Sequence, residues 1–291
     1  MKIAILITVH NRIAHTIKCL NSIRDTLTPN IREKIELTIF LTDDGSTDGS
    51  QRKILEQKYP MPIHILSGDG SLFWNGGMIV AWKAAIEMGP YDGYLWLNND
   101  TCVLPCFWQE LLSADANSQK IYRRRGIYVG STRDSDSNSF TYGGFVYTNK
   151  FTLKDKFILP DGNSFQPCEA AHGNITYVSA DVVKKQGIFT QRYHHGGSDH
   201  DYTYLAHKAG FPVLVLPNYS GICINDHKPE EGVEKYAALS LKERLRTMDL
   251  HNTLLFNRRC FPWRYPFVLI AGYTRAFFPN FAQWLYLRLR S

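Results

Sequence analysis

No run of about 20 uninterrupted apolar residues occurs in the 291-residue chain, so the sequence offers no conventional transmembrane helix. A basic start and an apolar run over residues 3–9 open the chain, but His10, Asn11 and Arg12 end that run too early for a signal peptide. Repeats and low-complexity tracts are also missing, and 44% hydrophobic against 21% charged residues is an ordinary globular balance. We therefore expect a globular protein that is large enough to bury a sizeable core.

Closely spaced cysteines are scarce as well. Of the six cysteines only Cys102 and Cys106 lie near each other, at a spacing that is not typical of a zinc pair. We expect all six to be free and mostly buried thiols. This usage fits the reducing cytoplasm.

Acidic residues are few at the C-terminal end. Residues 241–291 carry nine Lys and Arg against two acidic residues, a net +7, whereas the whole chain carries +6. The remainder is therefore nearly neutral at −1, which argues against nucleic acid as the partner. The same segment has eleven aromatic residues from residue 256 onward, and prolines at 262, 266 and 279 divide it into pieces too short to span a bilayer.

This basic, aromatic segment has two interpretations. Apolar aromatic faces flanked by Arg suit an interfacial helix that lies on an anionic membrane leaflet. The alternative is a helical cap packed on the rest of the chain, or a contact in a homodimer. We favour the first and expect a cytoplasmic protein that is peripheral on the inner face of the cell membrane.

Strand and helix patterns alternate along the first third of the chain. Apolar runs at residues 3–9, 35–41, 63–66 and 94–97 predict strands, and helical spacing follows the first three at 13–23, 49–58 and 77–88. This alternation predicts an α/β fold with a mostly parallel central sheet, helices on both faces and a crevice at the polar strand ends. After residue 104 the pattern loosens into shorter β-like runs, including residues 140–147, before a predicted helix at 199–209 and a strand at 213–216.

Four carboxylate-bearing loops follow predicted strands or open predicted helices, at residues 43–46, 98–100, 197–201 and 225–227. Singly, each is explained by a turn or a helix cap. Together they form an oxygen-rich site that suits Mg²⁺ or Mn²⁺ with a bound diphosphate, and one carboxylate remains to act as a base. The glycine-rich loop at residues 68–77 has neither the Walker nor the dinucleotide-binding spacing, and it offers backbone amides to phosphate. Trp74 in that loop either walls a sugar pocket or belongs to the core.

In order along the chain, residues 5–12 (ILITVHNR), 43–48 (DDGSTD), 97–100 (LNND) and 197–201 (GSDHD) resemble successive motifs of family-2 inverting glycosyltransferases with the type-A fold. Residues 68–78 (GDGSLFWNGGM) are similar to the rhamnosyltransferase-like subset, which builds bacterial surface polysaccharides. The resemblance covers roughly residues 2 to 230. It implies a type-A, Rossmann-like catalytic domain over residues 1–235, followed by a helical extension over 236–291. Residues 1–104 would bind the nucleotide sugar, and residues 105–235 would bind the acceptor and carry the base.

The resemblance implies roles for individual residues in nucleotide-sugar binding. It assigns Thr8, His10 and Arg12 to the nucleotide end of the crevice. It assigns Asp44, with Asp43 beside it, to the base and ribose. The implied nucleotide-sugar residues are Thr8, His10, Arg12, Asp43, Asp44, Trp74, Asn98, Asn99 and Asp100.

Two further sites follow from the same resemblance. Asp100 takes the last place of the family's Asp-x-Asp motif and would bind the metal. The neutral Asn98 replaces the first aspartate, so the site loses one negative charge and would hold the ion more weakly. His227 is similar to a C-terminal histidine that is a further ligand in some relatives. Asp199 matches the aspartate of the Glu-Asp motif and would be the general base, although Ser198 replaces the glutamate.

The predicted function is a metal-dependent inverting glycosyltransferase, a hexosyltransferase in enzyme class 2.4. It would move rhamnose or another hexose from a dTDP- or UDP-sugar to a hydroxyl of a glycan acceptor. The expected acceptor is a growing, lipid-linked bacterial surface polysaccharide, such as O-antigen or capsule. The departures at Asn98 and Ser198 keep a catalytically silent nucleotide-sugar-binding or scaffold protein as an alternative. A sugar nucleotidyltransferase is a second alternative, because it also uses acidic loops and a metal on a similar sheet.

Overall fold

The computed structural model describes residues 1–194, 196–224, 239–281, 284 and 288. The chain divides into two compact units, Met1–Asn225 and Asp226–Ser291. The domain boundary expected near residue 235 lies outside the described residues.

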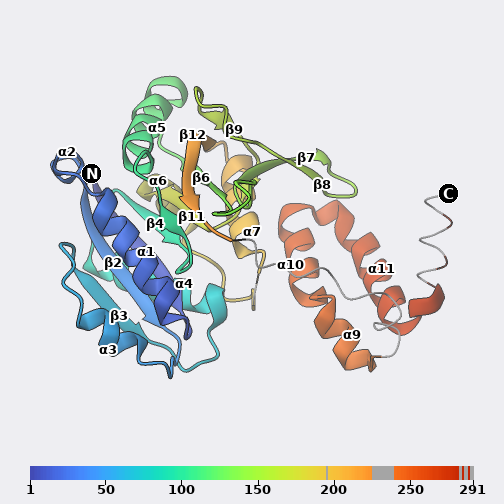
Figure 1. The fold of residues 1–291 in the computed structure, drawn as a ribbon. Coiled ribbons are helices and arrows are strands. Elements are labelled where there is room, and N and C mark those ends of the chain that lie inside the picture. Colours follow the sequence, from blue (N-terminus) through green and yellow to red (C-terminus); the bar gives the residue numbers. More distant parts are fainter. Residues whose placement is uncertain (195, 225–238, 282–283, 285–287, 289–291) are drawn as a thin grey trace. The chain divides into compact units, whose positions relative to one another are not determined.

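Among the described residues of the first unit, nine strands form one central sheet (Figure 1). Its path is β3-β2-β1-β4-β11-β6-β12-β5, and β9 also pairs with β12. Strands β3, β2, β1 and β4 are parallel, as are β6 and β12, whereas β11 runs antiparallel to both β4 and β6. The strands are β1 (Lys2–Val9), β2 (Glu36–Asp43), β3 (Ile63–Ser67), β4 (Gly93–Leu97), β5 (Cys102–Val103), β6 (Ile127–Arg133), β9 (Gln166–Pro167), β11 (Ile175–Ser179) and β12 (Val213–Ile222).

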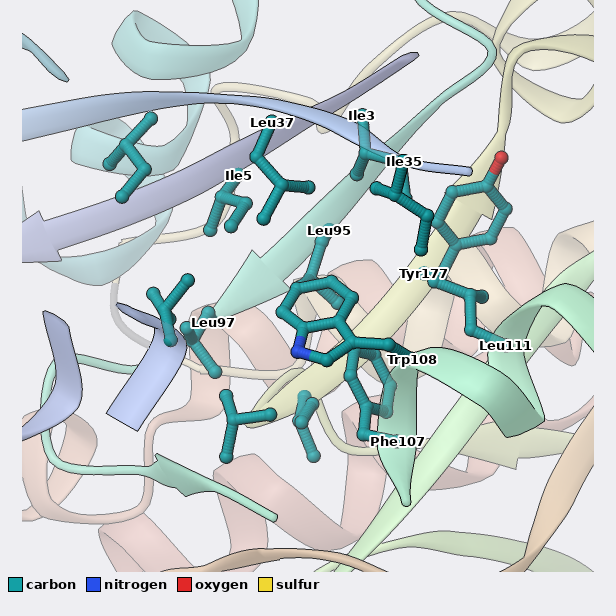
Figure 2. Packing of buried hydrophobic residues seen from close by; sticks show 14 of the residues in the cluster. Ile3, Ile5, Ile35, Leu37, Leu95, Leu97, Phe107, Trp108, Leu111 and Tyr177 are labelled. Carbon is teal, nitrogen blue, oxygen red and sulfur yellow. The ribbon is translucent and has the colours of Figure 1, made fainter. Parts of the chain in front are cut away.

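Helices cover both faces of this sheet because alternate residues of each strand point to opposite sides. On one face Ile3 and Ile5 pack with the apolar side chains of α1 and α5, as Figure 2 shows for Phe107, Trp108 and Leu111. On the other face, neighbouring residues of the same strand pack against α4, α6 and α7. The helices are α1 (Ile13–Thr26), α2 (Pro29–Arg32), α3 (Ser50–Leu55), α4 (Phe73–Met88), α5 (Phe107–Tyr122), α6 (Ala180–Gln186) and α7 (Ser198–Lys208).

The alternating strands and helices predicted for the first third of the chain are confirmed, with small shifts at their ends. The region after residue 104 holds a helix that the sequence analysis did not assign, α5. Its buried stripe of Phe107, Trp108, Leu111 and Ala114 has helical spacing. A second, antiparallel sheet also forms there from β10 (Ala170–Ala171), β7 (Gly144–Asn149) and β8 (Lys154–Phe157), so the strand expected at 140–147 begins later.

The described part of the second unit is helical, as expected. It contains α9 (Leu241–Thr247), α10 (Leu250–Cys260), the short η1 (Pro262–Arg264) and α11 (Tyr265–Phe277). Helices α10 and α11 approach closely at Gly272, where an added Cβ would overlap Leu250 Cδ1. Within the described residues, no helix is both long and apolar enough to cross a membrane. All six cysteines of the chain are free, as predicted.

Candidate active site

The carboxyl ends of β1, β2, β3 and β4 lie along one edge of the sheet, and the predicted motifs follow them. In register, Val9 is opposite Asp43, and Asp43 is opposite Ser67. Backbone hydrogen bonds continue past the strand ends, since Asp44 N donates to Val9 O and Gly68 N donates to Asp43 O, both at 2.8 Å. The motif residues are therefore brought together, as the alternating pattern predicted.

Asp44 holds the glycine-rich loop against β2. The residue is only 3% exposed, and its Oδ1 and Oδ2 accept hydrogen bonds from Gly70 N at 2.8 Å and Phe73 N at 3.0 Å. Gly68 has no room for a side chain, since a Cβ there would lie 2.5 Å from Asp44 Oδ1. Asp43 similarly accepts from Ser46 N at 3.0 Å. Both carboxylates thus shape loop backbone, and their contacts to base and ribose remain a prediction.

The loop after β1 contacts both neighbouring strand ends. His10 is exposed and its Nδ1 donates to Asp44 O at 2.6 Å. Arg12 begins α1 in the left-handed conformation at φ 63°, and its Nη1 donates to Asp100 Oδ2 at 3.1 Å. Thr8 Oγ1 is buried and has no hydrogen-bond partner among the described residues. Arg12 is therefore the residue of this loop that places a cation beside the expected metal-binding carboxylate.

The two asparagines after β4 point in different directions. Asn98 Oδ1 accepts a hydrogen bond from Trp74 Nε1 at 2.8 Å, which ties the start of α4 to the end of β4. Asn99 is 9% exposed, and its Nδ2 donates to Thr16 Oγ1 of α1 at 3.0 Å. Asn99 is thus a structural link between β4 and α1, whereas Asn98 and Trp74 lie at the edge.

Asp100 has a second partner that the sequence analysis missed. Cys223, which follows β12, lies with its Sγ 3.7 Å from Asp100 Oδ1, and Asn174 Nδ2 donates to the same sulfur at 3.5 Å. Burial, followed by the charge of Asp100, raises the pKa of Cys223 to about 12. The thiol therefore stays protonated at neutral pH and can donate to the carboxylate. No local sequence signal marks this contact, since 123 residues separate the two.

Asp100 is the carboxylate available to a metal in the described part of the site. Within the described ranges, no group of three or more His, Cys, Asp or Glu side chains could hold a metal ion. His227 lies outside the described residues. Mg²⁺ is commonly bound by one or two protein carboxylates together with substrate phosphates and water. Asp100, which is 23% exposed, fits a metal that is held largely by the diphosphate of a donor.

Asp199 lies in the first turn of α7, where the helix dipole favours a negative charge. Its Oδ2 accepts from Gly173 N and its Oδ1 from His200 N, both at 2.9 Å. Gly173 is a second residue that the sequence analysis missed. A Cβ on it would lie 2.8 Å from ring carbons of Trp74 and 3.4 Å from Asp199 Cβ. Through Gly173, the expected base is connected to Trp74 and Asn98 at the strand ends.

Trp74 and Ser198 complete the arrangement. Trp74 is half-buried and packs against Phe189, with ring centroids 5.5 Å apart, so it contributes to the core while also lying against Gly173. Ser198 is 1% exposed, and its Oγ has no hydrogen-bond partner among the described residues. The site is thus built from the ends of β1, β2 and β4, the start of α4 and the start of α7.

Residues 4–173 match the sequence profile described as Glycosyl transferase family 2. The chain belongs to this family. No curated protein matches the chain. Its family membership agrees with the α/β architecture, which is the type-A glycosyltransferase fold.

Solved structures of glycosyltransferases share the fold of this family member at low sequence identity. The structure of S. aureus TarS 1-349 in complex with UDP-GlcNAc superposes with a TM-score of 0.56 at 13% identity, covering 88% of this chain and 66% of that chain. The mannosyltransferase PcManGT from Pyrobaculum calidifontis, in complex with GDP-Man and Mn²⁺, gives a TM-score of 0.53 at 14% identity, covering 98% of this chain and 78% of that chain. The present chain therefore spans slightly less than two thirds of the TarS fragment.

Proposed function

We propose that the chain is a metal-dependent inverting glycosyltransferase that moves rhamnose or another hexose from a nucleotide diphosphate sugar to a hydroxyl of a growing, lipid-linked bacterial polysaccharide, O-antigen or capsule. The observation that carries this proposal is the position of Asp199. Two backbone N–H groups fix its carboxylate, and Gly173 connects it to Trp74 at the strand ends. A fixed carboxylate beside a nucleotide-sugar site is what direct displacement by a hydroxyl requires.

Each described residue has a task in this reaction. Asp199 takes the proton of the acceptor hydroxyl as that oxygen attacks the anomeric carbon, and a single displacement inverts the configuration there. Arg12 lies next to Asp100 and would offset the charge of the departing diphosphate. Asp100 would hold Mg²⁺ or Mn²⁺, which when bound stabilises the same negative charge. Cys223 and Arg12 contact the two oxygens of Asp100 and so fix its orientation.

The donor is proposed to be a dTDP- or UDP-sugar. Support comes from the relatives of similar fold, whose structures hold UDP-GlcNAc, UDP, or GDP-Man with Mn²⁺. The nucleotide would lie along the ends of β1 and β2, where the backbone around Asp44 and the glycine-rich loop is tightly organised.

The deciding experiment is a donor screen with the purified chain, glycan acceptors and Mg²⁺ or Mn²⁺, with nucleoside diphosphate release as the readout. Replacing Asp199→Asn should lower turnover by roughly 10²- to 10⁴-fold, because the base is lost at nearly constant side-chain size, although one of the two backbone N–H groups loses its acceptor. Asp181→Asn is the matched control, since Asp181 is exposed in the first turn of α6. Undiminished transfer by Asp199→Asn would reject the base.

The same screen separates the two alternative functions. A silent binding protein is favoured by the neutral residues Asn98 and Ser198, and it would bind nucleotide sugars without turnover of any donor. A nucleotidyltransferase would instead release pyrophosphate in a parallel reaction that supplies a nucleoside triphosphate and a sugar 1-phosphate. Either result would overturn the transferase proposal.

For the second unit we propose binding to an anionic membrane surface. Helix α11 leaves Phe267, Ile270 and Phe277 at 59%, 66% and 52% exposure, and residues 241–291 carry a net +7. Exposed apolar side chains beside cations suit the interface of an anionic leaflet. The double variant Phe267→Ser, Ile270→Ser should lose sedimentation with phosphatidylglycerol vesicles. Retained vesicle binding, or conversion of a wild-type dimer to a monomer, would favour the homodimer contact instead.

A further inference from the structure

A cluster of aromatic rings lies beside Asp199 and has no role in the reaction as described so far. His172 and His200 adjoin Gly173 and Asp199 in sequence, and their ring centroids are 4.8 Å apart. Phe145, which is 1% exposed, lies beneath both at 5.6 and 5.0 Å. The rings are thus placed by the same two segments that fix the carboxylate.

The exposed part of this cluster comes from the small antiparallel sheet and the segments next to it. Tyr142 and Phe157 lie 5.4 and 5.7 Å from the ring of His172, and Phe140 lies 4.8 Å from Phe157. Phe157 ends β8 and is 38% exposed, whereas the other three are half-buried. We call Phe140, Tyr142, Phe157 and His172 the ring face.

The ring face combines stacking surface with one fixed polar group. His172 Nδ1 lies 3.0 Å from Gly143 O and donates to it, which fixes the orientation of the imidazole ring. Sugar-binding surfaces need this combination, because a pyranose has an apolar C–H face that stacks on a ring and hydroxyls that need directed partners.

We propose that the ring face is the acceptor subsite and that it binds a pyranose ring of the acceptor glycan. His172 of the ring face directly precedes Gly173, whose N–H donates to Asp199 Oδ2 at 2.9 Å, so a sugar stacked there presents a hydroxyl to the base. It is built from β8, the segment before β7 and the residue after β10, whereas the nucleotide edge is built from β1, β2 and β4. This proposal rests on the proposed glycosyltransferase function.

The test uses the full chain and methyl glycosides of glucose, galactose and rhamnose, with saturation-transfer NMR as the binding measurement. Phe157→Leu keeps the bulk but removes the ring, and it should weaken glycoside binding about three- to tenfold. Phe157→Tyr should bind as the parent does, and so should Leu159→Ala, which alters an exposed apolar side chain two residues further on. Tyr142→Leu repeats the test from a second segment in case Phe157→Leu does not fold.

Equal binding by the parent and both leucine variants, or no binding of any methyl glycoside, would overturn the proposal. A second arm separates acceptor from donor sugar. The affinity for UDP-glucose, measured by calorimetry, should be the same in the parent and in Phe157→Leu, and a loss there would assign the ring face to the donor and reject the proposal. Nucleoside diphosphate release tests the proposed function separately, because glycoside binding can be measured whether or not any donor is turned over.

Discussion

The two units of the chain use their side chains in contrasting ways. In the first unit, directed hydrogen bonds hold polar groups of the site in place, as between Asp199 and Gly173 or between Asn98 and Trp74. In the second unit, α11 presents several large apolar side chains to solvent, including Phe267 and Ile270. Hydrogen bonds depend on distance and angle, so they hold side chains in one geometry. The hydrophobic effect is non-directional, so exposed apolar side chains can bind a surface in many orientations. Single substitutions should therefore have large effects in the first unit and small, additive effects in the second.

After the replacement of Asp199 itself, the largest expected effect comes from Gly173→Ala. The added methyl would lie 2.8 Å from ring carbons of Trp74 and 3.4 Å from Asp199 Cβ, so the base or the indole must move. A shift of about 1 Å in a catalytic group can cost roughly a hundredfold in turnover. We expect such a loss in steady-state assays, together with a stability cost of about 1–3 kcal/mol in thermal unfolding.

Gly196→Ala is the control for this substitution, because a Cβ at Gly196 has no heavy atom within 4 Å. It should keep both turnover and stability. If Gly173→Ala also keeps full turnover, the geometry of the site does not depend on this close contact, and the proposed contrast between the two units fails.

Trp74→Phe should have the next largest effect. The change keeps a ring against Gly173 but removes the Nε1–H that Asn98 Oδ1 accepts at 2.8 Å. Stability should fall by about 1 kcal/mol for the lost hydrogen bond, and turnover roughly tenfold as the start of α4 loosens from β4. A double-mutant cycle with Asn98→Ala checks the contact. Strictly additive effects of the two changes would show that it has no energetic role.

These contacts mark the limit of what the sequence predicted. The order of strands, loops and helices around β1 to β4 is encoded locally, so periodicity and capping residues are enough to predict Asp44 and Asp100 at one edge of the sheet. Gly173, Cys223 and the ring face act through contacts with residues far away in sequence, and no local pattern identifies such partners. Helix α5 is a different case, because the helical spacing of its apolar residues is a local pattern that predicts a helix. Asn99 lies within a predicted motif, but its side chain donates to Thr16 Oγ1 of α1, and the motif alone does not predict that contact.

Arg12→Gln separates binding from stability within the first unit. The pair with Asp100 is half-exposed, with 48% and 23% of the two side chains accessible, so its loss should change stability by less than about 1 kcal/mol. Nucleoside diphosphate affinity should nevertheless fall about tenfold, because Arg12 is the cation proposed to offset the charge of the diphosphate. Calorimetry with UDP and thermal unfolding measure the two quantities. A large drop in stability with unchanged affinity would make Arg12 a structural residue only.

The smallest single effect is expected in the second unit, from Ile270→Ser. Ile270 is 66% exposed, so the folded unit loses little packing and its unfolding temperature should stay the same. Burying one such side chain in an interface contributes about 1–2 kcal/mol at most, and neighbouring rings share the attachment, so vesicle affinity should fall only severalfold. Phe267→Ser should have a similar effect, and the two should add, because the interface imposes no unique geometry. If either single change abolished vesicle binding, the second unit would hold a specific pocket or partner contact, and the contrast with the first unit would fail.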